Sequence, residues 1–231
     1  MVLTLTVALA EQAEKPVLFW KKSEKPYGVF SNFYEEDMVF VFLWFIRAYA
    51  DWVPDKVTVP CSEVAIMLCK AAMCGDATRF KQLLDLKAPP GKVGAEAKKI
   101  GRQVAKPLPE APEVDVGQWK DSAWQLFVPL IAHSVVSQKF RQSPFLKNIL
   151  LASGSRDIGE ASPGDGTWGL NAGEEELQDV PPADWPLFGQ NLLGYALMSA
   201  RDELAMEYAA DSALLHGCEE LPQEEVVTTT A

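Results

Sequence analysis

Apolar residues recur along this chain mainly at helical spacing. The clearest stripe lies in residues 191–208, where one face of a predicted amphipathic helix carries Leu192, Leu193, Ala196, Leu197, Ala200 and Leu204. Residues 63–74 are apolar on nearly every side, which predicts a buried helix. Ser62 is its expected N-cap and Gly75 its expected C-terminal stop.

Shorter apolar patterns predict further helices at residues 77–86, 92–104 and 145–152. Asp76 and Ser143 precede the first and the last of them as expected N-caps. Residues 122–141 are also mostly helical in pattern, and Pro129 is expected to kink or split that helix because proline has no backbone N–H to donate.

Strand patterns are fewer and shorter. Residues 17–20 and 158–161 each predict a short strand, whereas the apolar run at residues 38–44 fits a buried strand or a helix equally well. We therefore expect an α+β fold, a single compact domain that is rich in helices and has a few short strands. Its expected bounds are residues 17–208, between a variable leader (1–16) and an acidic, disordered tail (209–231).

Composition supports one packed domain and limits its partners. The chain has 231 residues, of which 48% are hydrophobic and 23% charged, and its formal net charge is -11. That charge opposes attraction to nucleic acid and to anionic membranes. The apolar run at residues 38–46 is too short to cross a bilayer, so we expect a soluble cytoplasmic protein. A basic cluster at Lys98, Lys99 and Arg102 is interpreted as a solvated helix face.

Several kinds of site are excluded by what the sequence lacks. The four cysteines (Cys61, Cys69, Cys74 and Cys218) form no CxxC pair and the chain has only two histidines, so no metal site is expected. Buried thiols in a reducing compartment explain the cysteines best. The chain has no GxxxxGK[ST] phosphate-binding motif, no GxGxxG directly after a strand and at the start of a helix, and no GxSxG nucleophile motif.

Two constellations could carry chemistry. Glu63 and Lys70 are seven residues apart on one apolar helix, which brings them to nearly the same face. Charged groups on a buried helix are costly unless they are paired or used, although both could lie at an exposed edge. Asp165 precedes Trp168 in a glycine-rich loop, where an indole could stack on a ring and the backbone could approach a ligand. An ordinary Asp-Gly turn with a packing tryptophan explains that loop as well.

Weaker candidates are residues that could wall a pocket. Asn191 precedes the amphipathic helix and could cap it or help to bind phosphate. Trp119 follows a proline-rich loop and could line a pocket or belong to the core. Asn32, in the aromatic turn at residues 28–34, could supply a side-chain hydrogen bond.

Taken in order, these segments resemble the NADAR family of YbiA-like proteins. The resemblance rests on PYGVFSNFY (26–34), SEVAIMLCKAAMCGD (62–76), Lys139-Phe140 with Gln142 in a KFxQ pattern, LLASGSRDIGEASPGDGTWG (150–169) and GQNLLGYALMSARDEL (189–204). Each motif alone is modest, but the five together span most of the foldable chain.

The resemblance implies an N-glycosidase that cleaves the C1′–N bond of a ribose-containing compound and needs no cofactor. Two substrate classes are known in the family: phosphorylated intermediates of riboflavin synthesis, and ADP-ribose attached to guanine. Nucleic acid would then be a partner only as a modified substrate. The resemblance makes Glu63, Lys70 and Asp165 the expected catalytic residues. It makes Tyr27, Asn32, Trp119, Trp168 and Asn191 the expected substrate-binding residues.

Two departures from the family pattern keep other functions open. Val64 and Ala65 follow Glu63 where the family usually has polar and aromatic residues, and residues 38–59 are longer and more apolar than usual. The first departure favours a non-catalytic module that binds ADP-ribose or a nucleotide. The second favours an accessory protein whose apolar segment docks a partner.

Overall fold

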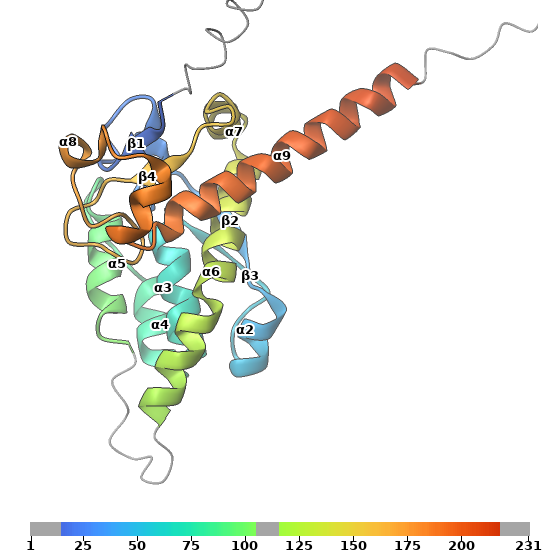
Figure 1. The fold of residues 1–231 in the computed structure, drawn as a ribbon. Helices are drawn as coiled ribbons and strands as arrows, with labels where there is room; N and C mark the ends of the chain where they lie inside the picture. Colours follow the sequence, from blue (N-terminus) through green and yellow to red (C-terminus); the bar gives the residue numbers. More distant parts are fainter. Residues whose placement is uncertain (1–14, 105–115, 218–231) are drawn as a thin grey trace, which may run out of the picture.

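The chain folds around one nearly all-apolar helix. The computed structural model describes residues 15–104 and 116–217, and Figure 1 shows how the elements are arranged. Helix α3 (Ser62–Met73) lies at the centre, and α2 (Trp44–Tyr49), α4 (Ala77–Leu84), α5 (Val93–Gly101) and α6 (Val116–Gln142) all pack against it. Because neighbours cover it on every side, an all-round apolar sequence is stable there.

Two small sheets complete the domain. Strands β1 (Val17–Phe19) and β4 (Ile158–Glu160) pair in parallel, with Val17 opposite Ile158. Strands β2 (Met38–Val41) and β3 (Lys56–Val59) pair antiparallel, with Met38 opposite Val59. The remaining elements are η1 (Tyr27–Phe30), α7 (Pro144–Leu151), α8 (Glu174–Leu177), η2 (Pro182–Leu187) and α9 (Leu192–Gly217).

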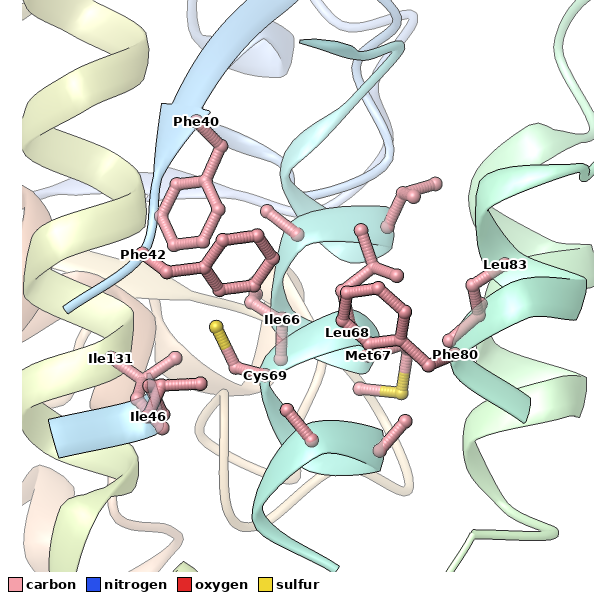
Figure 2. Packing of buried hydrophobic residues seen from close by; sticks show 14 of the residues in the cluster. Phe40, Phe42, Ile46, Ile66, Met67, Leu68, Cys69, Phe80, Leu83 and Ile131 are labelled. Carbon is pink, nitrogen blue, oxygen red and sulfur yellow. The ribbon is translucent and has the colours of Figure 1, made fainter. Parts of the chain in front are cut away.

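Buried side chains form two large cores. The first surrounds α3 and includes Phe40, Phe42, Ile66, Leu68 and Phe80 (Figure 2). The second joins β1, β4, α6, α7 and α9. The Trp168 ring packs against both cores, and the site described below lies at that junction.

The apolar run at residues 38–44 becomes a strand and then leads into a helix. Met38 and Phe40 of β2 point into the core, while Val39 and Val41 are about half exposed. The outer edge of β2 pairs with two side chains of α6. Gln142 exchanges hydrogen bonds with the backbone N–H and C=O of Val39 (2.9 and 2.8 Å), and Gln138 does the same with Val41 (2.8 and 3.0 Å).

The fold class is confirmed: the domain is helix-rich α+β with a few short strands. The cap at Asp76 is confirmed by its hydrogen bond from the Arg79 N–H (2.9 Å), and that at Ser143 by its bond from the Leu146 N–H (3.4 Å). Gly75 follows α3 with a φ of 66°, in the left-handed conformation expected of a helix stop.

One helix cap was predicted wrongly, and the predicted split of another helix is absent. Ser62 lies inside α3, and Cys61 precedes the helix in an extended conformation. The Asn32 carbonyl instead accepts the Glu63 N–H (3.0 Å), so a neighbouring turn satisfies the helix end. Pro129 does not split α6, which runs unbroken through it. Packing against α3 and α9 outweighs the roughly 3 kcal/mol that an internal proline costs.

The structure describes only part of the cysteine set and of the two chain ends. Cys61, Cys69 and Cys74 are buried, while Cys218 lies outside the described residues. Helix α9 continues to Gly217, beyond the domain end expected at residue 208, and most of the leader and the last part of the tail are not described. No helix in the described ranges is both long and apolar enough to span a bilayer.

Candidate active site

A small cavity lies at the junction of the two cores. It encloses about 90 Å³, and residues from α3, α5, β4 and three loops line it. The lining residues are Glu63, Glu160 and Asp165 with Lys98, the aromatic residues Trp20, Phe33 and Trp168, and the polar residues Ser31, Asn32 and Ser162. The cavity therefore combines three carboxyl groups and one ammonium with rings that could stack on a substrate.

Glu63 lies in the first turn of α3 and is only 6% exposed. Its position depends on the aromatic turn before β2, because the Asn32 carbonyl accepts the Glu63 N–H. Burial raises the pKa of the Glu63 carboxyl to about 7; Lys98 opposes that rise and Asp165 adds to it. A carboxyl with this pKa exchanges its proton readily near neutral pH, as a general acid or base must.

Glu160 ends β4 and faces the same cavity. Its Oε2 atom is buried and has no hydrogen-bond partner among the described residues. The pKa of this carboxyl is raised to about 8, mainly by burial; the negative charge of Asp165 contributes to the rise and Lys98 opposes it. Glu160 therefore favours its protonated form at neutral pH.

Asp165 is held in a different way. Its Oδ1 accepts the backbone N–H groups of Thr167 (3.3 Å) and Trp168 (3.0 Å), and its Oδ2 accepts the Lys98 ammonium (3.0 Å). These bonds fix the loop and orient Trp168. Gly169 lets the loop lie against β4, because a Cβ at that position would lie 2.6 Å from the Glu160 carbonyl.

Lys98 is the one lysine among the residues that line this cavity. It projects from α5 to Asp165, and its Nζ lies 5.7 Å from the centre of the Phe33 ring. Its neighbour Lys99 pairs instead with Glu96 on the exposed side of the helix. The prediction that Lys98, Lys99 and Arg102 form a solvated helix face therefore fits Lys99, but Lys98 points into the cavity.

Lys70 is not part of the cavity lining. Its Nζ donates to the Gly101 carbonyl at the end of α5 (3.1 Å) and lies 6.0 Å from the centre of the Trp124 ring. Seven residues of helix return Lys70 to the face of Glu63, but they also separate the two residues by about 10 Å along the axis. A catalytic role for Lys70 stays a prediction.

The other expected binding residues lie in different surroundings. Asn32 and Trp168 line the cavity. The Tyr27 hydroxyl accepts a hydrogen bond from Arg156 (2.6 Å) beside a separate pocket of about 510 Å³. Asn191 is buried directly before α9, where its carbonyl accepts the Tyr195 N–H (3.0 Å), but its side chain bonds to the backbone of β4 and is not among the residues that line the cavity. Trp119 lies in α6, and its side chain is outside the described part of the structure.

Sequence reasoning missed Lys98, Glu160, Trp20 and Phe33 as site residues. Glu160 stands in the EASPGDGTWG segment, five residues before Asp165, and that segment was the available signal. Within the described ranges, no group of three or more His, Cys, Asp or Glu side chains is arranged to hold a metal ion.

The chain is similar to known proteins in sequence and in overall fold. A family model described as the NADAR domain matches residues 18–205. A curated relative, "N-glycosidase R617" of Acanthamoeba polyphaga mimivirus, is 30% identical over 142 residues, which is 62% of this chain and 72% of the relative. The NMR structure of the E. coli protein YbiA superimposes with a TM-score of 0.55 at 21% identity, over 92% of this chain and 94% of that chain. This structural likeness supports the fold alone.

Proposed function

This chain belongs to the NADAR domain family, and we propose that it is an N-glycosidase that hydrolyses the C1′–N bond of a ribose-containing substrate. The observation that carries the proposal is the meeting of Glu63, Glu160 and Asp165 around one cavity beside Trp168. The viral relative named as an N-glycosidase supports the same reaction type.

The carboxyl groups suit this reaction. Cleavage of a C1′–N bond leaves positive charge on the sugar, and a fixed carboxylate nearby stabilises that charge. Asp165 fits this role, because its three hydrogen bonds hold it in one position. Glu63, with its pKa near 7, is suited to take a proton from the attacking water.

The aromatic residues and the size of the cavity suggest how a substrate would lie. The volume of about 90 Å³ is well below the roughly 300–1,000 Å³ of pockets that enclose whole ligands. We expect the cavity to hold the reacting part of the sugar and the base to lie at its mouth against Trp168. Trp20, which is 42% exposed, also stands at the cavity wall.

An amine that contacts the substrate is better supplied by Lys98 than by Lys70. Lys98 already lines the cavity, whereas Lys70 would first have to leave the Gly101 carbonyl. In this proposal Lys98 orients Asp165, and Lys70 stabilises the C-terminal end of α5, where a positive charge is favourable.

The proposal is tested with the two substrate classes of the family. The purified chain is incubated with ADP-ribosylated guanosine and with an aminopyrimidine riboside phosphate, and release of the free base is followed by chromatography. We expect release from at least one compound, and a loss of about 10²–10⁴-fold in Glu63→Gln and Asp165→Asn. Glu96→Gln, on the exposed side of α5, is the matched control and should retain full activity.

Two results would count against the enzyme. Tight binding of ADP-ribose in calorimetry without any release of base would show a binding module instead. Release that persists at the normal rate in both site variants would place the chemistry elsewhere in the molecule.

A further inference from the structure

We infer that Glu160 is the catalytic acid that protonates the departing nitrogen, with Asn191 as the residue that positions it. This role rests on the proposed N-glycosidase function and adds a division of labour among the three carboxyl groups. Glu160 was not among the candidates from the sequence, and its place in the cavity brings it forward.

The hydrogen bonds of the carboxyl groups separate their roles. Three N–H donors point at the oxygens of Asp165, which therefore acts as an acceptor. By contrast, Glu160 Oε2 is buried and has no partner in the described part of the chain. A buried carboxylate oxygen without a donor is costly, whereas a carboxylic acid can keep its proton there until a substrate atom accepts it.

The charges around Glu160 support the same assignment. Asp165 from the loop and Glu63 from α3 both disfavour ionisation of Glu160, and Lys98 from α5 favours it. Burial is the largest influence on both carboxyls and raises the pKa of Glu160 to about 8 and that of Glu63 to about 7. Both groups therefore hold a proton near neutral pH for part of the time, and Glu160 is the one whose buried oxygen has no hydrogen-bond partner among the described residues.

Asn191 fixes the backbone that carries this acid. Its Oδ1 accepts the Glu160 N–H (3.1 Å) and its Nδ2 donates to the Ile158 carbonyl (2.9 Å). Asn191 itself has a φ of 48°, a left-handed conformation that asparagine tolerates well. Gly194 makes room for the contact, because a Cβ there would collide with the Ile158 carbonyl and the Asn191 amide. The side chain therefore serves the strand and has no direct contact with the cavity.

The proposed step balances in atoms and electrons. As the C1′–N bond breaks, its electron pair goes to nitrogen, which takes the proton from Glu160. The oxygen of a water molecule bonds to C1′, and Glu63 takes the released proton. The products are the free base and the free sugar. Exchange with solvent then returns a proton to Glu160 and removes one from Glu63.

The test compares two leaving groups. A riboside of a neutral base needs a proton on nitrogen as it departs, whereas nitrophenyl riboside releases a stable anion that needs none. In Glu160→Gln we expect a loss of about 10²–10⁴-fold with the base riboside but only about tenfold or less with nitrophenyl riboside. Glu63→Gln should lose activity on both compounds, because both require an activated water. Glu96→Gln should match the wild type on both.

A pH profile gives a second readout that does not depend on the nitrophenyl compound. Wild-type cleavage of the base riboside should fall as pH rises past about 8, and Glu160→Gln should lack that descending limb. Glu160→Asp keeps the acid on a shorter arm and should recover part of the rate. It also decides the matter if the glutamine variant folds poorly.

The outcomes separate this inference from the proposed function. Equal losses on both compounds, or no loss on either, would overturn the acid role of Glu160 while leaving the N-glycosidase intact. An unchanged descending limb in Glu160→Gln would overturn it as well. A wild-type protein that releases no base would refute the proposed function, and the role of Glu160 would fall with it.

Discussion

Lys139 allows a quantitative test of how the cavity wall is supported. It is only 4% exposed, and its Nζ donates to the carbonyls of Val29 (2.6 Å) and Ser31 (3.1 Å), in the turn that carries Asn32 into the cavity. Burial lowers the pKa of Lys139 from 10.5 to about 7, although Cys61 and Glu36 oppose the shift. Replacing the residue in Lys139→Met removes this titrating group from the core.

The direction of the pH effect follows from proton binding. Between pH 7 and pH 10.5 the unfolded chain keeps the Lys139 proton and the folded chain releases it, so the free energy of unfolding of the wild type rises with pH. At about 1.4 kcal/mol per pH unit, the gain from pH 7 to pH 10 is roughly 4 kcal/mol. This is an upper bound, because the two carbonyls favour the charged amine.

The measurement is denaturant unfolding of wild type and Lys139→Met at several pH values from 7 to 10. We expect the stability difference to move steadily in favour of the wild type as pH rises. Burial raises the pKa of Cys61 and Lys139 lowers it, so titration of Cys61 acts in the opposite direction, and does so at least as strongly in Lys139→Met as in the wild type. Lys81→Met changes an exposed lysine and should give a flat difference. A flat difference for Lys139→Met as well would refute the reasoning.

Three further predictions concern the site and its packing. Asn191→Ala leaves the Glu160 N–H and the Ile158 carbonyl without their side-chain partner. Denaturant titrations should show a free energy of unfolding lower by about 2–4 kcal/mol, and a change below about 0.5 kcal/mol would contradict this. The raised pKa of Glu63 makes the folded state lose stability as pH rises from 4.5 to about 7. The free energy of unfolding of Glu63→Gln should therefore rise relative to that of the wild type by up to about 3 kcal/mol over that window. Thermal melts at pH 5 and pH 7.5 measure this change, and a constant difference would argue against it. Gly101→Ala adds a Cβ that overlaps the Met67 side chain of α3 and should lower the free energy of unfolding by about 1–3 kcal/mol. Gly166→Ala is the control: the nearest atom to its added Cβ is 3.5 Å away, so the free energy of unfolding should change by no more than about 0.5 kcal/mol.

The sequence predicted the main helices better than it predicted strand β3 or the start of α3. The stripe at residues 191–208 and the apolar run around α3 indicated two main helices, because burial imposes their periodicity directly. Strand β3 (Lys56–Val59) was missed, since an alternation of only four residues is too short to stand out from its neighbours. The start of α3 depends on the carbonyl of Asn32, a contact that a cap rule based on nearby residues cannot anticipate.

The site was predicted in part for a similar reason. Glu63, Asp165 and Trp168 stood out because a charge on an apolar helix and an indole in a glycine loop are unusual locally. Lys98 has ordinary surroundings in the sequence, and Glu160 was not singled out although it stands in the EASPGDGTWG segment; the approach of α5 and β4 to the loop brings both to the cavity. Helical register predicts that Lys70 shares a face with Glu63, but the seven-residue spacing also separates the two by about 10 Å along the helix axis.

The two glutamines that pair with β2 have a consequence for how the protein behaves in a crowded solution. Residues four apart on a helix rise about 6 Å, close to the 6.6–6.8 Å between alternate residues of a strand, so Gln138 and Gln142 reproduce the hydrogen bonds of a neighbouring strand. A free strand edge can pair with the strands of other molecules, and these two amides occupy the edge of β2 so that it cannot. Replacing either glutamine should expose this edge and increase aggregation at high protein concentration.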